Sequence, residues 1–580
     1  MFADAAWNTN RYDQLKRLCS PTLIVHDPAN PVTGTGPDAY ATFVSRVTDG
    51  ARDVDAAVDS VIVANGKVAI HSSGTLRGAV LESQPDSEAD ETTFSAFEVI
   101  HIEDDRIVEW SGTMLPDRTL KEFQAGFAGD VICPDDETYD ESRAVWNGMI
   151  DKYPGLILRC AGVADVIDAV NLAHEHNLLV AVRGGGHNVA GSAVCDGGIV
   201  IDLSAMTGVW VDPDERTAWV QAGATLGKVD RETQAFGLAT PLGVVSATGV
   251  AGLTLGGGLG HLRNKYGLSS DNLASVDIVT TDGEYFTASA NEHQDLFWGV
   301  RGGGGNFGVV TGFEFDLHPV GPEVSTVLVI YHGDDGAQVM RSFQEYNQSS
   351  PDEISVIASL GTMPDEELFS ADVVHEFKIG IVGMYAGSPA EGEVVIEPLR
   401  ELADPLVDFS GMMPYTDFQR AFDEDYPDGL RYYWKSLYLE SLSDEVIDRI
   451  IEWGNAAPSP LSTADVWAVG GAVADIGLDD SAFQGRAAPY LLAVEANWQD
   501  PEDDEANVAW ARGFLDDMKQ FSDGSVYLNF PGFHEGGNET IERTFGDAYQ
   551  RLVETKTAYD PENRFRVNQN VQPLTEEGTR

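Results

Sequence analysis

The 580-residue sequence has few cysteines, few basic residues and no long apolar run. Its four cysteines, Cys19, Cys133, Cys160 and Cys195, show no CxxC spacing, so we predict neither a metal site nor a disulfide framework. No apolar stretch reaches the roughly 18 residues that a membrane-spanning helix needs, so we predict no membrane partner. The N-terminal residues lack a basic segment followed by an apolar one, so we expect no secretory signal and a cytoplasmic protein.

Basic residues are scarce relative to acidic ones. The chain has 36 Lys and Arg against 94 Asp and Glu, a formal net charge of −58 at pH 7. A surface of this sign repels nucleic acid, so we expect no nucleic-acid partner. The acidic residues are spread along the chain rather than gathered in one tail. Salt screens the repulsion between so many like charges, so we expect the cytoplasm of a halophile. An ordinary acidic protein is the alternative.

The length predicts several domains. Short β-branched and aromatic runs predict strands at 60–64, 68–72, 93–102 and 106–110, with a hairpin turn at Asp104 and Asp105. The polar stretch 126–140 is typical of a linker. Apolar residues at helical spacing predict helices at 163–177, 443–453 and 505–519.

Three successive glycines, Gly184, Gly185 and Gly186, follow the apolar run 178–182 and precede His187. Without Cβ atoms, the backbone N–H groups of such a turn can approach an anion closely. A second glycine track, 252–260, could form the other wall of the same site. The pattern predicts a large phosphate-bearing cofactor that is held by loops and tethered by His187.

These motifs belong to an ordered series within residues 130–575. The series comprises 180–191 (VAVRGGGHNVAG), 202–205 (DLSA), 249–258 (GVAGLTLGGG), 265–268 (KYGL), 271–273 (DNL), 295–298 (DLFW), 301–310 (RGGGGNFGVV), 527–530 (YLNF) and 559–570 (YDPENRFRVNQN). It resembles the berberine bridge enzyme-like branch of the vanillyl-alcohol oxidase/p-cresol methylhydroxylase superfamily. The resemblance implies an α+β multidomain protein. A two-subdomain α+β FAD-binding domain would span 126–322, and a substrate-binding domain with a helix-covered antiparallel sheet would span 323–520. A C-terminal module at 521–580 would complete the FAD site.

The resemblance implies FAD as the cofactor, with a covalent bond from His187 to the flavin 8α-methyl group. Many relatives add a link from a cysteine to flavin C6, but Val245 stands at that position and cannot form a thioether. We therefore expect a single link. The expected FAD-binding residues are Arg183, Gly184, Gly185, Gly186, His187, Asn188, Ser192, Gly249, Gly252, Leu253, Gly256, Gly257, Gly258, Gly260, Tyr266, Gly267, Asp271, Asn272, Gly308, Val309, Asn568 and Asn570. Asn568 and Asn570 would hold the flavin pyrimidine edge, because amides match its alternating donors and acceptors.

The implied chemistry moves a hydride from a C–H bond of an alcohol, sugar, lactol or amine to flavin N5. By the same resemblance, Tyr527 and Asn529 would be catalytic residues that face the flavin. Lys435 would lower the pKa of the tyrosine or contact the small-molecule substrate. Thr248 stands where oxygen-reactive relatives often have a small branched residue, so we favour O2 as the acceptor. A dehydrogenase with another acceptor is the alternative, and a homo-oligomer is left open.

Residues 1–125 resemble SnoaL-like polyketide cyclases in the runs 12–15 (YDQL), 25–28 (VHDP), 38–40 (DAY) and 107–110 (IVEW). The resemblance implies an α+β barrel, a cone of curved sheet closed by helices, and such a fold often hosts no catalysis. His26, His101 and Asp117 are candidate acid–base groups, with dimerisation or substrate capture as alternatives. A bifunctional cyclase–oxidase and a non-catalytic binding protein also remain open.

Overall fold

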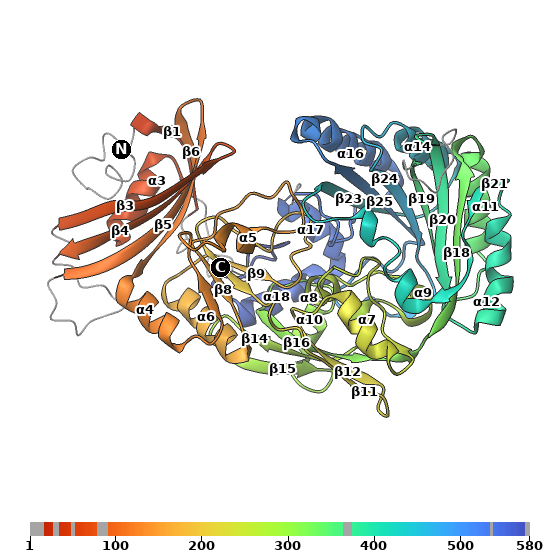
Figure 1. The fold of residues 1–580 in the computed structure, drawn as a ribbon, viewed down its shortest axis with the longest axis horizontal. Helices are drawn as coiled ribbons and strands as arrows, with labels where there is room; N and C mark the ends of the chain where they lie inside the picture. The colour runs from red at the N-terminus through yellow and green to blue at the C-terminus, as the bar shows by residue number, and fades with distance from the viewer. Residues whose placement is uncertain are drawn as a thin grey trace.

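The computed structural model describes residues 17–26, 34–47, 53–77, 91–363, 374–533 and 537–574. Figure 1 shows a large N-terminal sheet at one end of the molecule, a second large sheet at the other end, and the glycine-rich region between them. Within the described residues, no helix combines the length and apolar character needed to cross a bilayer.

The N-terminal sheet has six strands in the order β2-β1-β6-β5-β4-β3. They are β1 (Cys19–His26), β2 (Gly34–Thr35), β3 (Asp53–Ala64), β4 (Lys67–Arg77), β5 (Glu91–Glu103) and β6 (Arg106–Pro116), accompanied by α3 (Pro37–Val47) and α4 (Asp117–Gly126). The four predicted strands are confirmed. The hairpin turn is also confirmed, because Asp104 and Asp105 have φ angles of 47° and 60°, as a tight two-residue turn requires. Closure of this sheet into a barrel stays a prediction.

Two smaller sheets form the middle of the chain. The first, in the order β7-β8-β10-β9, contains β7 (Asp130–Ile132), β8 (Leu156–Arg159), β9 (Val180–Arg183) and β10 (Ile199–Asp202). The second is antiparallel, in the order β11-β12-β16-β14-β15, and contains β11 (Val209–Asp212), β12 (Thr217–Gln221), β14 (Leu273–Val279), β15 (Tyr285–Ser289) and β16 (Val309–Asp316). Helix α6 (Val163–Glu175) contacts both sheets and confirms the helix predicted at 163–177. The linker predicted at 126–140 is wrong in part, because β7 pairs with β8 inside it.

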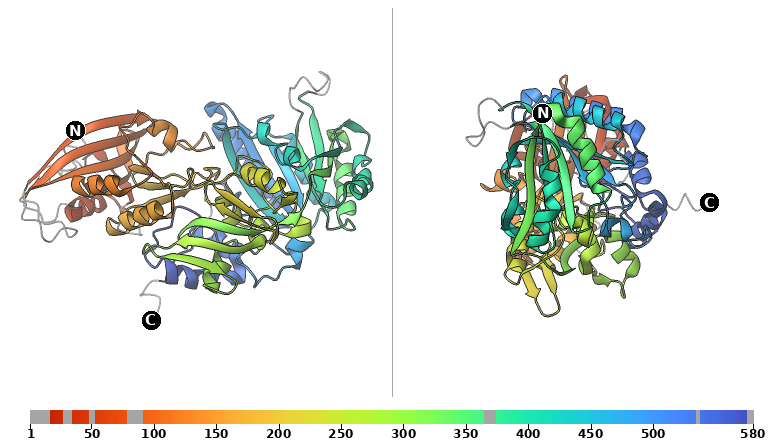
Figure 2. Two further views of the ribbon diagram at one scale, coloured as in Figure 1. Left: turned by 60° about the horizontal axis from the view of Figure 1, so that its bottom comes forward. Right: turned by 90° about the vertical axis from the view of Figure 1, so that its right-hand side faces the viewer.

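The eight-stranded sheet is antiparallel throughout. Its main path is β21-β18-β20-β19-β24-β25-β23, and β22 pairs with β18. The strands are β18 (Glu323–His332), β19 (Ile354–Thr362), β20 (Phe377–Tyr385), β21 (Pro405–Asp408), β22 (Gly411–Pro414), β23 (Arg431–Leu439), β24 (Thr463–Ala468) and β25 (Tyr490–Trp498). The helices α11 (Gly336–Asn347), α14 (Asp444–Asn455) and α16 (Asp504–Met518) share one core with one face of this sheet. The other face is turned toward the glycine-rich loops, as Figures 1 and 2 show.

The remaining elements are short strands and helices that connect these sheets. They are β13 (Leu238–Ala239), β17 (His318–Pro319), α5 (Tyr139–Arg143), α7 (Leu226–Gln234), α8 (Val250–Leu255), α9 (Arg263–Tyr266), α10 (Gln294–Val300), α12 (Pro389–Ile396), α13 (Tyr415–Phe418), α15 (Ala472–Asp475), α17 (Gly537–Phe545) and α18 (Tyr549–Tyr559).

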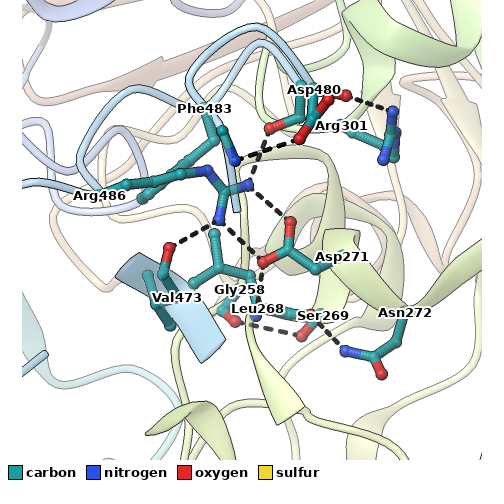
Figure 3. Close-up of polar contacts among 12 residues, drawn as sticks. Gly258, Leu268, Ser269, Asp271, Asn272, Arg301, Val473, Asp480, Phe483 and Arg486 are labelled. Atoms are coloured by element: carbon teal, nitrogen blue, oxygen red, sulfur yellow. Dashed lines mark hydrogen bonds and ion pairs between the residues drawn. The ribbon is translucent and has the colours of Figure 1, made fainter. Parts of the chain in front are cut away.

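A buried ion pair joins the loop between α15 and β25 to the glycine-rich region (Figure 3). Arg486 donates to the two carboxylate oxygens of Asp271 at 2.6 and 3.0 Å, and both side chains are 2% exposed. Arg486 also donates to the carbonyl oxygen of Val473, and Asp271 accepts a hydrogen bond from the backbone N–H of Leu268. The pair therefore holds two regions together that are far apart in the sequence.

Removing the cation from this pair should strongly destabilise the protein. Arg486→Met leaves the Asp271 carboxylate buried without its cation, which typically costs about 3–5 kcal/mol. The urea midpoint of unfolding, measured in high salt, checks this loss. The matched control is Arg341→Met, which removes the exposed pair with Asp444 and should cost less than about 1 kcal/mol. Equal shifts for the two variants would contradict the prediction.

Candidate active site

A cavity of about 880 Å³ lies between the glycine-rich loops and the open face of the eight-stranded sheet. Fourteen of the residues predicted from the sequence line it: Gly184, Gly185, Gly186, His187, Asn188, Ser192, Gly249, Gly252, Leu253, Gly256, Gly308, Tyr527, Asn529 and Asn568. The predicted loops and the C-terminal module therefore meet around one space, although they are separated by up to several hundred residues in the chain.

The two glycine-rich loops touch backbone to backbone. A Cβ atom on Gly185 would lie 2.4 Å from the backbone nitrogen of Gly249, and one on Gly249 would lie 2.3 Å from the nitrogen of Gly185. Neither position has room for a side chain. The adjacent Gly186 has a φ of 71°, in the left-handed region that favours glycine, and it leads directly into His187. We call this contact the glycine seam.

The imidazole of His187 is held in a defined orientation beside the seam. Its ring stacks on Trp146 with centroids 4.3 Å apart, and its Nδ1 lies 3.4 Å from the Thr248 hydroxyl oxygen. Burial lowers the pKa of His187 to about 4, and Asp423 offsets this shift only in part. The ring is therefore neutral at neutral pH, so a nitrogen lone pair is available for bond formation.

The donors and acceptors around this space fit FAD. Among the described residues, two buried polar atoms at the cavity wall, Nε2 of His187 and the side-chain oxygen of Asn568, have no hydrogen-bond partner, and neither does the side-chain oxygen of Asn570 outside the wall. Buried polar atoms in proteins are nearly always paired, so these three point to a polar ligand. The amide nitrogen of Asn568 already donates to the carbonyl oxygens of Gly305 and Phe565, which leaves its oxygen to accept from the ligand.

Other predicted cofactor residues lie behind the cavity wall and hold the loops. Arg183 donates to the carbonyl oxygens of Ser142 and Ala144. Asp271 is paired with Arg486, and the amide of Asn272 donates to the carbonyl oxygens of Tyr266 and Leu268. The cavity wall does not include Arg183, Gly257, Gly258, Gly260, Tyr266, Gly267, Asp271, Asn272, Val309 or Asn570.

Tyr527 and Asn529 form a connected pair at the cavity wall. The Tyr527 hydroxyl oxygen accepts hydrogen bonds from the backbone N–H of Leu259 at 3.1 Å and from the Asn529 amide at 2.8 Å. Burial raises the pKa of Tyr527, and these two hydrogen bonds offset the rise only in part. The phenol therefore stays protonated at neutral pH. Because its oxygen serves as the acceptor in both contacts, its proton can be donated into the cavity.

Lys435 is not brought to this cavity. Side chains alternate along β23, and Trp434 lines the cavity. Tyr433 and Lys435 point to the other face, where the Tyr433 hydroxyl accepts from Arg512 of α16 and the Lys435 ammonium lies 6.0 Å from the Tyr433 ring centre.

Two buried carboxyl groups that were not predicted line the same cavity, Asp465 on β24 and Glu495 on β25. Tyr426 donates to Glu495 at 2.8 Å, whereas Oδ1 of Asp465 has no partner among the described residues. Burial raises the pKa of Asp465 to about 6, and burial together with the charge of Asp465 raises the pKa of Glu495 well above its usual range. An acidic residue inside each apolar strand run (TADVWA and YLLAVEANW) is the sequence signal that could have identified them.

The acid–base candidates of the N-terminal sheet do not form one site. His26 and His101 both lie beside Glu109, at 2.6 and 3.8 Å, in a partly exposed position. Asp117 accepts a hydrogen bond from Ser95, which lies at the other end of β5 from His101. A separate buried carboxyl, Glu98, accepts hydrogen bonds from Tyr40 and Trp110.

Comparison with known families identifies three regions. Residues 1–114 match SnoaL-like polyketide cyclase, 154–289 match the FAD binding domain, and 526–572 match the family described as berberine and berberine like.

Relatives that align over nearly all of their own length support these matches. An uncharacterised FAD-linked oxidoreductase of Bacillus subtilis (strain 168), YgaK, is 32% identical over 77% of this chain and 97% of its own length. The (R)-6-hydroxynicotine oxidase of Paenarthrobacter nicotinovorans is 31% identical over 77% of this chain and 97% of its own length.

Solved structures confirm the fold. The 6-hydroxy-D-nicotine oxidase of Arthrobacter nicotinovorans superposes with a TM-score of 0.70 at 28% identity, covering 77% of this chain and 99% of that chain. A chitooligosaccharide oxidase, at 22% identity and a TM-score of 0.69, covers 79% of this chain and 99% of that chain and shows the fold alone. On these similarities and on the site described above, the chain belongs to the berberine bridge enzyme-like family of FAD-linked oxidoreductases, and it also carries a SnoaL-like N-terminal domain.

Proposed function

We propose that this FAD-linked oxidoreductase is an oxidase of a small molecule that carries an O–H or N–H group next to the reacting C–H bond. An alcohol, a sugar or lactol, and an amine all meet this description. One observation carries the proposal: a single cavity joins the glycine seam and His187 on one side to Tyr527, Asp465 and Glu495 on the other. The names of two similar proteins, a hydroxynicotine oxidase and a chitooligosaccharide oxidase, fit this range of substrates.

His187 is proposed to form the only covalent link to the cofactor. Its neutral, stacked imidazole supports this role, and Val245, which also lines the cavity, cannot supply a thioether. Asn568 and Asn570 would bind the pyrimidine edge of the flavin through their unpartnered oxygens. When bound, FAD would supply the acceptor for a hydride from the substrate.

The carboxyl groups would take up the substrate proton. A proton must leave the O–H or N–H group as the C–H bond is broken, and the accepting group must be within hydrogen-bond reach. Asp465 has a pKa of about 6 and an unpartnered oxygen, so it is mainly ionised at neutral pH. Burial and the charge of Asp465 raise the pKa of Glu495 and favour its protonated form, because two charges in this buried space would repel each other.

Tyr527 and Asn529 would orient the substrate. The fixed phenol can donate its proton in a hydrogen bond to the oxygen or nitrogen of the substrate. Apolar side chains on the cavity wall, including Ile330, Phe422 and Trp434, would exclude water. O2 is the proposed electron acceptor, and the small side chain of Thr248 beside His187 supports its access. The charge of −58 supports a halophilic cytoplasm as the setting.

Replacing His187 tests the link. In the unmodified chain, acid precipitation should leave a yellow pellet, and peptide mass mapping should place the flavin on the peptide that contains His187. His187→Ala should release all flavin on precipitation, because the bond-forming nitrogen is gone. The exposed His332→Ala variant serves as the control and should keep its flavin. Covalent flavin in the His187→Ala protein would refute the assignment.

Asp465→Asn tests the base. The rate of anaerobic flavin reduction should rise with pH through about 6 in the unmodified enzyme, because the carboxyl group accepts a proton only when ionised. The substrate used would be the member of a panel of alcohols, sugars and amines that bleaches the unmodified protein. The amide variant should react about 10²–10⁴-fold more slowly and lose this acidic limb. Asp448→Asn, on the exposed side of α14, should change neither quantity. An unaltered pH profile in Asp465→Asn would exclude Asp465 as the base.

A further inference from the structure

The N-terminal domain is packed against the FAD-binding region over one face of its sheet. Alternate residues of β5 divide between the two faces: Phe94 and Ala96 join the core that contains α3, whereas Phe97 and Val99 join cores of the FAD-binding region. In Figure 1 this sheet lies beside the region of α5, α6 and β8. Because β5 contributes buried residues to a core on each of its faces, the N-terminal domain is docked rather than freely moving.

Two polar contacts of this interface are made to the loop that follows His187. Residues 188–198 run from the cavity, which Asn188 and Ser192 line, to Asp196 at the interface. All three oxygen atoms of Asp196 accept hydrogen bonds. Its Oδ2 accepts from Lys67 at 2.6 Å and its carbonyl oxygen accepts from Ser111 at 2.6 Å, both in the N-terminal domain. Its Oδ1 accepts from the backbone N–H of Tyr153 at 2.8 Å.

The residue after Asp196 touches the N-terminal domain through its backbone. Gly197 has a φ of 66°, and a Cβ atom there would lie 2.8 Å from the backbone nitrogen of Gly112 in β6. The close approach fixes the distance between the loop and the sheet.

Lys67 also restrains the neighbouring segment. Its ammonium donates to the carbonyl oxygen of Asp151 at 3.0 Å. The next residue, Lys152, donates to the carbonyl oxygens of Gly191 and Val194 in the loop, at 2.8 and 3.2 Å. The loop forms no helix or strand of its own, so its conformation depends on these contacts.

We propose that the N-terminal domain acts as a positioning element for cofactor binding. Through Asp196, the residues Lys67 and Ser111 would hold the loop so that Asn188 and Ser192 are in place for FAD. The inference rests on the proposed function, because the ligand of this loop is FAD. An irregular loop that must be ordered on binding costs conformational entropy, and a docked domain removes part of that cost beforehand. Lys67 and Ser111 are positioning residues, since neither lines the cavity.

The test measures release of FAD in a His187→Ala background, in which the cofactor is exchangeable. The double variant Lys67→Met/Ser111→Ala should release FAD about tenfold faster, the change that about 1.4 kcal/mol produces. The matched control is Arg118→Met/Ser73→Ala, which removes the same two group types at the exposed contacts with Glu122 and Asp59. A variant with Lys67→Arg in place of Lys67→Met should release FAD more slowly than the double variant, because it keeps a cationic donor. Flavin fluorescence after dilution gives the rate.

Equal release from the double variant and its control would overturn the positioning role while leaving FAD binding intact. If the double variant is not folded, Ser111→Ala alone removes one hydroxyl and should still release FAD faster than Ser73→Ala. If the unmodified chain carries no flavin, the proposed function fails. Amide hydrogen exchange of 188–198 then decides the inference without the cofactor. Faster exchange in the double variant than in the control would support it, and equal exchange would overturn it.

Discussion

The contact between Gly185 and Gly249 is the constraint on which the rest of the site depends. Two loops that approach to within backbone van der Waals distance leave no room for a side chain on either one. Glycines of both loops line the cavity, and backbone that lacks side chains can approach a phosphate-bearing ligand closely. The seam also places His187 at its end, against Trp146 and Thr248.

Burial sets the protonation states around the cavity. It lowers the pKa of His187 to about 4 and raises the pKa values of Tyr527 and Glu495, which favours the neutral form of all three groups. Asp465, with a pKa of about 6, is the member of this group that changes charge in the neutral range. In a chain with a large negative charge, these carboxyl groups differ from most of the other acidic residues because they are removed from water and salt.

The N-terminal domain is integrated with the oxidoreductase through both apolar and polar contacts. Its sheet shares cores with the FAD-binding region, and Lys67 and Ser111 reach the loop that leaves the cavity. Its own histidines, by contrast, lie at a partly exposed position beside Glu109, away from Asp117. The interface therefore offers a clearer physical role for this domain than a separate acid–base site does.

The sequence alone indicated the family and fourteen of the residues that line the cavity, because glycine-rich loops and His187 are local signals that need no tertiary context. It also located the strands and helices with strong periodicity. Only the tertiary structure decided which face of β23 meets the cavity, and so separated Trp434 from Lys435. It alone brought Asp465 and Glu495 together, since strands distant in the sequence pair side by side. The docking of the N-terminal sheet was likewise hidden, because an apolar strand such as β5 does not specify which partner buries each of its faces.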